Sequence, residues 1–269
     1  QLFQYANAFA LSKKYNIDIF PEKNFAIISN IKFNRKFKLN LVIYKISELN
    51  ILVRLKVLLF FLFRKIKVNI FFKFIYENNH TKYEKILLDN NNVVLLGYWQ
   101  SENYFINYSS EINKQIQLPA NGTKIFNNFF NLIQNTNSVA ICIRVYDELS
   151  GDKSFVGGEE NADFYNKSIK LLEKKIKNPV YFIFSQKKYP IFYKIKITSK
   201  KYYITSENID FDELSNLSLI VKCKHHIISN SSYYWWGAWL SEKRNVSKTI
   251  YASSKFSNLD AIPERWNKI

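Results

Sequence analysis

The chain has 269 residues, 47% of them hydrophobic and 17% aromatic, which suffices for one large core or two smaller ones and excludes a mainly disordered protein. Its 6 glycines, 5 prolines and 2 cysteines exclude collagen-like, low-complexity and disulfide-stapled chains. The net charge of +17 favours nucleic acid, an anionic membrane or a phosphorylated substrate as partner, although an AT-rich genome alone would also enrich lysine. The chain holds no methionine and opens at Gln1, so we expect a fragment that lacks its first residues.

Few elements can be predicted in the first half of the chain. Apolar spacing predicts a helix over 2–15, and alternation over 16–20 predicts a short strand that Pro21 ends. The apolar run Val93–Leu96 predicts a further strand, and residues 101–105 predict the start of a helix.

Residues 51–76 interleave lysine and arginine with leucine and phenylalanine. Their longest uncharged run, 57–63, has seven residues, whereas a membrane-spanning helix needs about 20. Two interpretations fit this pattern: a basic amphipathic helix that lies on an anionic membrane, and a core-packing helix with a solvated basic face.

From residue 138 onward, strands and helices alternate. Strands are predicted at 138–144, 179–185, 202–205, 226–229 and 248–251, and helices at 161–177, 211–222 and 231–241. This alternation predicts an α/β protein with a parallel, doubly wound sheet. Polar runs at 119–124 and 133–138 are candidate boundaries, and we divide the chain into domains 1–135 and 136–269.

The carboxyl ends of parallel strands are where such sheets bind ligands. Arg144 ends the first strand of the second half, where its planar fork suits a phosphate, and Asp147 and Glu148 follow as orienting or proton-accepting carboxylates. A surface pair between Arg144 and a carboxylate is the alternative. Asn230, Ser231 and Ser232 follow a later strand, where they cap a helix whose N-terminus suits an anion.

The cysteines, histidines and tryptophans are expected to have structural rather than catalytic roles. The run Cys223–His226 would need further metal ligands, and only Cys142 and His80 remain, so we expect no metal site. Cys142 lies in a predicted buried strand and is not expected to be a nucleophile. The aromatic side chains of the last long helix are expected in the core: Tyr233, Trp235, Trp236 and Trp239. No dinucleotide, P-loop, zinc-finger or RNA-binding motif is present, so a nucleic-acid partner has no support.

Five segments, in order, resemble motifs of the bacterial α-1,2-fucosyltransferases, glycosyltransferase family 11. They are residues 1–6 (QLFQYA), similar to the end of GxGNQxFQYA; 97–105 (GYWQSENYF), similar to GYWQSEKYF; 142–147 (CIRVYD), at the place of HxRxGD; 182–185 (FIFS), similar to FxxFSDD; and 223–240, similar to CKHxIIANSSFSWWGAWL. The last of these motifs is the most specific.

The resemblance implies a GT-B-like fold, in which two Rossmann-like domains with parallel sheets face each other across a cleft. It implies an inverting, metal-independent transfer of fucose from GDP-fucose to a galactoside hydroxyl, in α-1,2 linkage. Arg144 would contact the β-phosphate, Ser231 and Ser232 would hold the pyrophosphate, and Asp147 would orient Arg144 or lie near guanine. We therefore assign Arg144, Asp147 and Glu148 to catalysis, add Ser185 and Asn230 to the donor site, and place Gln1, Gln4, Tyr98 and Gln100 on the acceptor side.

Several positions depart from the family's motifs. Cys142 stands for the histidine, Tyr146 for the glycine and Tyr234 for the second serine of FSWW, and Gln186-Lys187 replaces an acidic pair. The run RVYDE that begins at Arg144 is closer to divergent branches of the family, which leaves the donor base and the acceptor open.

The sequence thus predicts a fucosyltransferase-like enzyme of surface-polysaccharide or lipid-linked oligosaccharide synthesis that needs no cofactor. Its partners would be a nucleotide sugar and an oligosaccharide acceptor. It would work in the cytoplasm, at the inner face of the membrane, where segment 51–76 would contact anionic lipid. The alternatives are a GT-B transferase for another GDP-sugar and a catalytically inactive, basic, membrane-peripheral binding protein.

Overall fold

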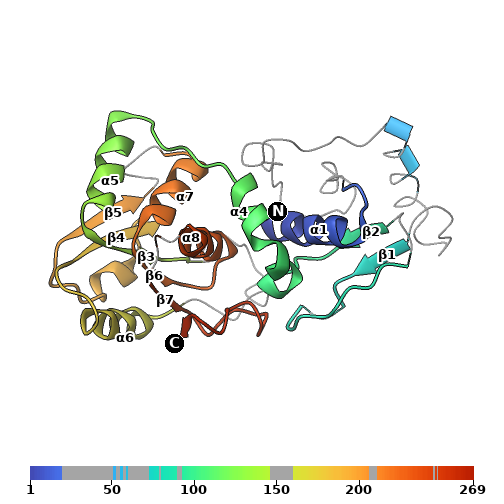
Figure 1. Cartoon of the computed structure of the whole chain (residues 1–269). Coiled ribbons are helices and arrows are strands. Elements are labelled where there is room, and N and C mark those ends of the chain that lie inside the picture. The colour runs from blue at the N-terminus through green and yellow to red at the C-terminus, as the bar shows by residue number, and fades with distance from the viewer. Residues whose placement is uncertain are drawn as a thin grey trace. The chain divides into compact units, whose positions relative to one another are not determined.

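The computed structural model describes residues 1–19, 51–52, 55–56, 59, 73–78, 80–89, 93–145, 160–205, 211–244, 246 and 248–269. The chain divides into two compact units, Gln1–Gln117 and Leu118–Ile269 (Figure 1). Each unit is built around its own parallel strands.

The first unit contains helix α1 (Leu2–Tyr15) and a parallel pair of strands, β1 (Lys73–Tyr76) and β2 (Val93–Leu96). The 3₁₀ turns η3 (Glu102–Tyr104) and η4 (Ile106–Tyr108) follow, and helix α4 (Ser109–Gln115) ends the unit. The apolar face of α1 is buried, and its Phe3 ring lies 6.2 Å from that of Phe105.

Two predictions for this unit are wrong. Residues 17–19 form no strand, because α1 ends at Asn16 in a left-handed conformation (φ 52°) and the N–H of Ile17 bonds back to the carbonyl of Ser12. The helix expected over 51–76 does not extend to its end, because Lys73–Tyr76 pairs with β2 as strand β1. Residues 51–52, 55–56 and 59 are helical, and much of the rest of this segment lies outside the described residues.

The second unit is a six-stranded, all-parallel sheet. Its strands run in the order β5-β4-β3-β6-β7-β8, with bounds Lys201–Thr205, Pro179–Ser185, Asn137–Cys142, His225–Ile228, Thr249–Ala252 and Asn267–Lys268. In chain order this is 3-2-1-4-5-6, the arrangement of the dinucleotide-binding Rossmann fold. The predicted α/β class with a parallel, doubly wound sheet is confirmed.

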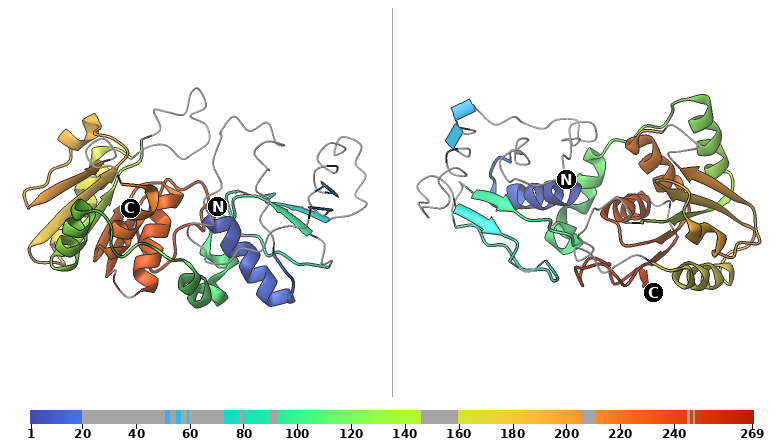
Figure 2. Two further views of the ribbon diagram at one scale, coloured as in Figure 1. Left: turned by 90° about the horizontal axis from the view of Figure 1, so that it is seen from above. Right: turned by 180° about the vertical axis from the view of Figure 1, so that it is seen from behind.

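Helices cover both faces of this sheet (Figures 1 and 2). Helix α6 (Ala162–Glu173) and the short η6 (Pro190–Tyr193) pack on Val139 and Ile141 of the central strand and on Ile143, which follows it. Helices α5 (Lys124–Gln134), α7 (Glu213–Lys222) and α8 (Ser232–Lys243) belong to the opposite face. Alternate residues of β3 therefore serve two separate cores, which explains why the strand is apolar throughout.

Close packing of α8 on α7 depends on a glycine. A Cβ on Gly237 would lie 2.5 Å from Cγ2 of Ile220. The helix also buries the tryptophans that the sequence assigns to the core: Trp235, Trp236 and Trp239 are at most 2% exposed. The expectation that these rings pack rather than bind a ligand is confirmed.

The division between the units falls after Gln117, near the candidate boundary at 119–124 and earlier than the predicted residue 135. Helix α5 belongs to the second unit, where the ring of its Phe126 lies 5.9 Å from that of Phe211. Helix α5 is amphipathic, and its apolar face is buried in the second unit. This burial explains why the chain divides before the helix.

Two buried histidines give the second unit a predicted sensitivity to acid. Burial, with Lys248 and Lys224 nearby, lowers the pKa of His225 from 6.5 to about 4, and burial lowers that of His226 to about 4 as well. The unfolded chain therefore binds more protons than the folded one below pH 6.5. We expect the free energy of unfolding to fall between pH 6.5 and about 4, by up to about 3 kcal/mol for each histidine, and not to depend on them at higher pH.

Urea unfolding at a series of pH values measures this effect. A free energy of unfolding that stays constant between pH 6.5 and about 4 would contradict the burial of both rings as neutral groups.

Candidate active site

The strand order creates one topological switch point in the second unit. β3 lies between β4 and β6, and the chain leaves β3 toward one side of the sheet and β6 toward the other. Ligands of such sheets bind beyond the carboxyl ends of the two strands that flank this point. Arg144 follows β3 and Asn230 follows β6, so the fold brings together the two places that the sequence singled out.

Arg144 is held at this edge by its own backbone. Its N–H donates to Oγ of Ser229 at 3.0 Å, and its Nη1 lies 3.3 Å from Oε1 of Gln186. The side chain is half-buried. The guanidinium is thus placed beside the end of β4, where Gln186 stands in place of an acidic residue, so this neighbour adds no negative charge.

The end of β6 leads directly into helix α8. Ser231 is the N-cap, with an extended backbone and no side-chain cap bond, and Ser232 is exposed in the first turn. Asn230 is buried, and its Nδ2 donates to the carbonyl of Lys255 at 2.6 Å. The positive end of the α8 dipole therefore lies at the switch point, where it favours an anion.

A second polar cluster adjoins this edge and was missed from the sequence. The buried carboxylate of Glu160 accepts a hydrogen bond from Ser253, and its Oε2 lies 3.5 Å from Nζ of Lys255. Ser253 follows β7, and its N–H bonds to the carbonyl of Ile228. Glu160 and Lys255 belong to no recognisable sequence motif. Their position at this edge of the sheet becomes visible only once the strand register is known.

Other predicted site residues have structural partners. Ser185 is buried and donates to the carbonyl of Ile143 at 3.1 Å. Tyr234 reaches the same carbonyl with its hydroxyl at 3.2 Å, so it bridges the ends of β3 and β4. Asp147 and Glu148, and Tyr146 before them, lie outside the described residues.

The predicted acceptor residues lie in the first unit. Nε2 of Gln4, on α1, donates to the carbonyl of Gly97 at 2.9 Å, which places it beside the loop that carries Tyr98. The Tyr98 side chain is 49% exposed. Gln1 is the exposed N-cap of α1, and Gln100 is half-buried. The structure therefore brings Gln4 and Tyr98 together at the carboxyl ends of the parallel pair β1 and β2.

The described ranges contain no group of three or more His, Cys, Asp or Glu side chains that could hold a metal ion. Cys142 and Cys223 are buried, burial raises the pKa of each thiol well above its usual range, and Nε2 of His226 pairs with the carbonyl of Ile220 at 2.8 Å. No helix of the described part is both long enough and apolar enough to cross a membrane.

Comparison with known proteins identifies relatives. The model of glycosyl transferase family 11 matches residues 19–269. An alpha-1,2-colitosyltransferase from Escherichia coli is 31% identical over 192 residues, which span 66% of this chain and 62% of that protein. The O-antigen biosynthesis glycosyltransferase WbnK, also from Escherichia coli, is 24% identical over 270 residues, 90% of this chain and 86% of that protein. A solved structure of an Arabidopsis thaliana FUT1 mutant with GDP gives a TM-score of 0.36 at 10% identity, over 70% of this chain and 52% of that one.

Proposed function

Because this chain belongs to glycosyl transferase family 11, we propose that it transfers fucose from GDP-fucose to a galactoside hydroxyl, in α-1,2 linkage and with inversion. The acceptor would belong to a surface polysaccharide or a lipid-linked oligosaccharide, in keeping with the O-antigen role in the name of one relative. The second unit would bind the nucleotide sugar and the first unit the acceptor.

One observation carries the donor half of this proposal. The switch point of the sheet brings Arg144 and the N-terminus of α8 to one edge. A guanidinium pairs with two phosphate oxygens through its planar fork, and helical N–H groups bind phosphate without further help. These groups would hold the diphosphate and stabilise the negative charge that develops on GDP as it leaves, so the proposal needs no metal ion.

The departures from the family's motifs fit this role. The hydroxyl of Tyr234 donates to the carbonyls of Ile143 and Phe184, so we expect it to hold the strand ends together rather than to bind the diphosphate. Cys142, which stands where the family's motif has histidine, is buried within β3. This difference therefore affects the packing of the core and not the anion site. We assign the remaining specificity for the base and sugar to Asp147 and Glu148, which lie outside the described residues.

Membrane contact is part of the proposal. Four apolar side chains in helical residues of the basic segment are between 48% and 70% exposed: Ile51, Leu52, Leu55 and Leu59. Exposed apolar residues among lysines and arginines suit the surface of an anionic bilayer. The enzyme would then work at the cytoplasmic face of the membrane.

A second donor is favoured by one relative. The colitosyltransferase shares 31% identity with this chain, which makes a GDP-linked colitose the alternative donor. The same diphosphate site would serve either sugar.

Isothermal titration calorimetry with GDP, GDP-fucose, GDP-mannose and UDP tests the proposal. We expect saturable binding of GDP and GDP-fucose and none of UDP, because the site would recognise both the diphosphate and guanine. Equal binding of UDP, heparin and DNA that vanishes with salt would instead support a general polyanion binder. Transfer to a galactoside, followed by product analysis, then separates an active enzyme from an inactive relative.

A further inference from the structure

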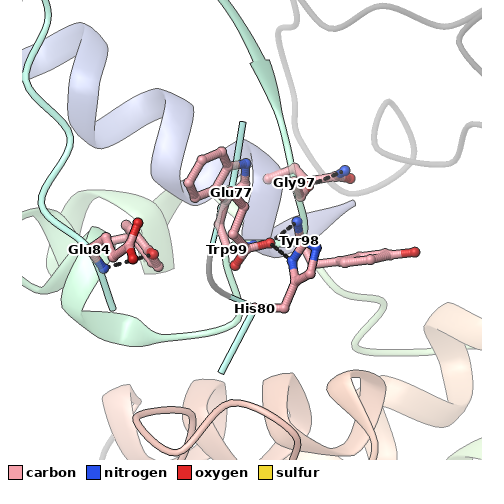
Figure 3. Close-up of polar contacts among 8 residues, drawn as sticks. Glu77, His80, Glu84, Gly97, Tyr98 and Trp99 are labelled. Carbon is pink, nitrogen blue, oxygen red and sulfur yellow. Dashed lines mark hydrogen bonds and ion pairs between the residues drawn. The ribbon is translucent and has the colours of Figure 1, made fainter. Parts of the chain in front are cut away.

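One buried carboxylate joins the ends of β1 and β2 in the first unit (Figure 3). Glu77 follows β1, and its side chain is 2% exposed. Its Oε2 accepts from the backbone N–H of Tyr98 at 2.7 Å, and its Oε1 accepts from that of Trp99 at 3.1 Å. A Cβ on Gly97 would lie 2.5 Å from Cβ of Glu77, so the loop needs glycine to approach this carboxylate.

The same carboxylate orients a histidine. Nδ1 of His80 lies 2.9 Å from Oε2 of Glu77. A carboxylate can only accept hydrogen bonds, and that of Glu77 already accepts from two backbone N–H groups. In neutral His80 the proton therefore lies on Nδ1, and Nε2 carries the lone pair.

The imidazole lies where a substrate can reach it. Its side chain is 60% exposed, and its ring packs edge-on against the ring of Tyr98, with centroids 6.0 Å apart. Figure 3 shows the His80 ring beside the Glu77 carboxylate and the Tyr98 side chain on the other side of that ring. A basic nitrogen beside an exposed aromatic ring is a suitable combination for a sugar, because the ring offers an apolar face and the nitrogen accepts a hydroxyl proton.

We propose that His80 is the catalytic base for the acceptor hydroxyl and that Glu77 is its positioning residue; this inference rests on the proposed function. The acceptor O–H gives its proton to Nε2 of His80 while its oxygen forms a bond to the anomeric carbon of the donor. The bond from that carbon to the β-phosphate oxygen breaks, and its electron pair leaves with GDP. Glu77 stabilises the imidazolium that forms, as a buried carboxylate does in other carboxylate–histidine pairs.

The test compares variants of the full chain in a transfer assay. His80→Ala is expected to lower kcat by about 10²- to 10⁴-fold. GDP binding and the melting temperature should remain at their wild-type values, and added imidazole should restore part of the turnover. Glu77→Gln removes the charge that stabilises the imidazolium and is expected to lower kcat by up to about 10⁴-fold. Lys82→Ala, an exposed neighbour, is the matched control and should keep wild-type kcat.

The possible results separate the two ideas. A wild-type protein that transfers no sugar from any GDP-sugar would overturn the proposed function and this inference with it. A wild-type protein that transfers sugar, together with a His80→Ala variant of unchanged kcat, would overturn the inference alone. A loss that imidazole does not restore and that accompanies a lower melting temperature would give His80 a structural role and reject it as the base.

Discussion

Replacement of Arg144 by alanine is expected to weaken GDP binding by about 1.5–3 kcal/mol, or roughly 10- to 150-fold, the scale of a charged hydrogen bond. The side chain is half-buried at the end of β3, and Nη1 has a neutral neighbour in Gln186 at 3.3 Å. Its loss would leave the diphosphate with the N-terminus of α8. The backbone N–H of residue 144 would still bond to Ser229, so the fold should be retained.

Calorimetry with GDP measures this loss. Arg265→Ala is the matched control, because Arg265 lies in the same unit and pairs with Glu242 at 2.7 Å, away from the switch point. Arg265→Ala should bind GDP as the wild type does. Wild-type affinity in Arg144→Ala would remove this residue from the donor site, whereas equal losses in both variants would indicate a general effect of charge.

Replacement of Trp235 by alanine is expected to destabilise the second unit by about 3–5 kcal/mol. Trp235 is fully buried, stacks on Trp239 with centroids 6.0 Å apart, and donates from Nε1 to the carbonyl of Ala261 at 2.6 Å. The truncation would leave a large cavity and an unpaired buried carbonyl. Both effects favour the unfolded state.

Urea unfolding followed by circular dichroism checks this prediction. Tyr193→Ala is the control, since Tyr193 is 89% exposed and its removal should change the free energy of unfolding by no more than about 0.5 kcal/mol. If Trp235→Ala unfolds with the same midpoint as Tyr193→Ala, the tryptophans of α8 do not hold the core together.

The sequence predicted most elements of the second unit because each has a clear apolar pattern and a clear boundary. The strand Pro179–Ser185 was placed with its observed bounds, as was the helix Leu2–Tyr15 of the first unit. The strand order could not be read, because the pairing of β3 with β6 is set by tertiary packing of helices on two faces. Strand β1 was missed, because its four residues, KFIY, continue the basic pattern of the preceding segment.

Some residues of the candidate site could be predicted from the sequence and others could not. Arg144 and Asn230 were found because each ends a recognisable strand, whereas Glu160 and Lys255 reach the edge through contacts that only the register reveals. Glu77 and His80 are three residues apart outside any helix, a spacing that predicts no contact. Their pairing follows from the turn after β1.

The parallel pairing at the centre of the sheet has a consequence for synthesis of the chain. The contact between Ser185 and Ile143 spans 42 residues, whereas that between Arg144 and Ser229 spans 85. A nascent chain can therefore assemble β3, β4 and β5 first, with one edge of β3 still open to other strands. That edge of β3 closes only when β6 emerges from the ribosome, and the open edge of the sheet then moves outward until β7 and β8 pair.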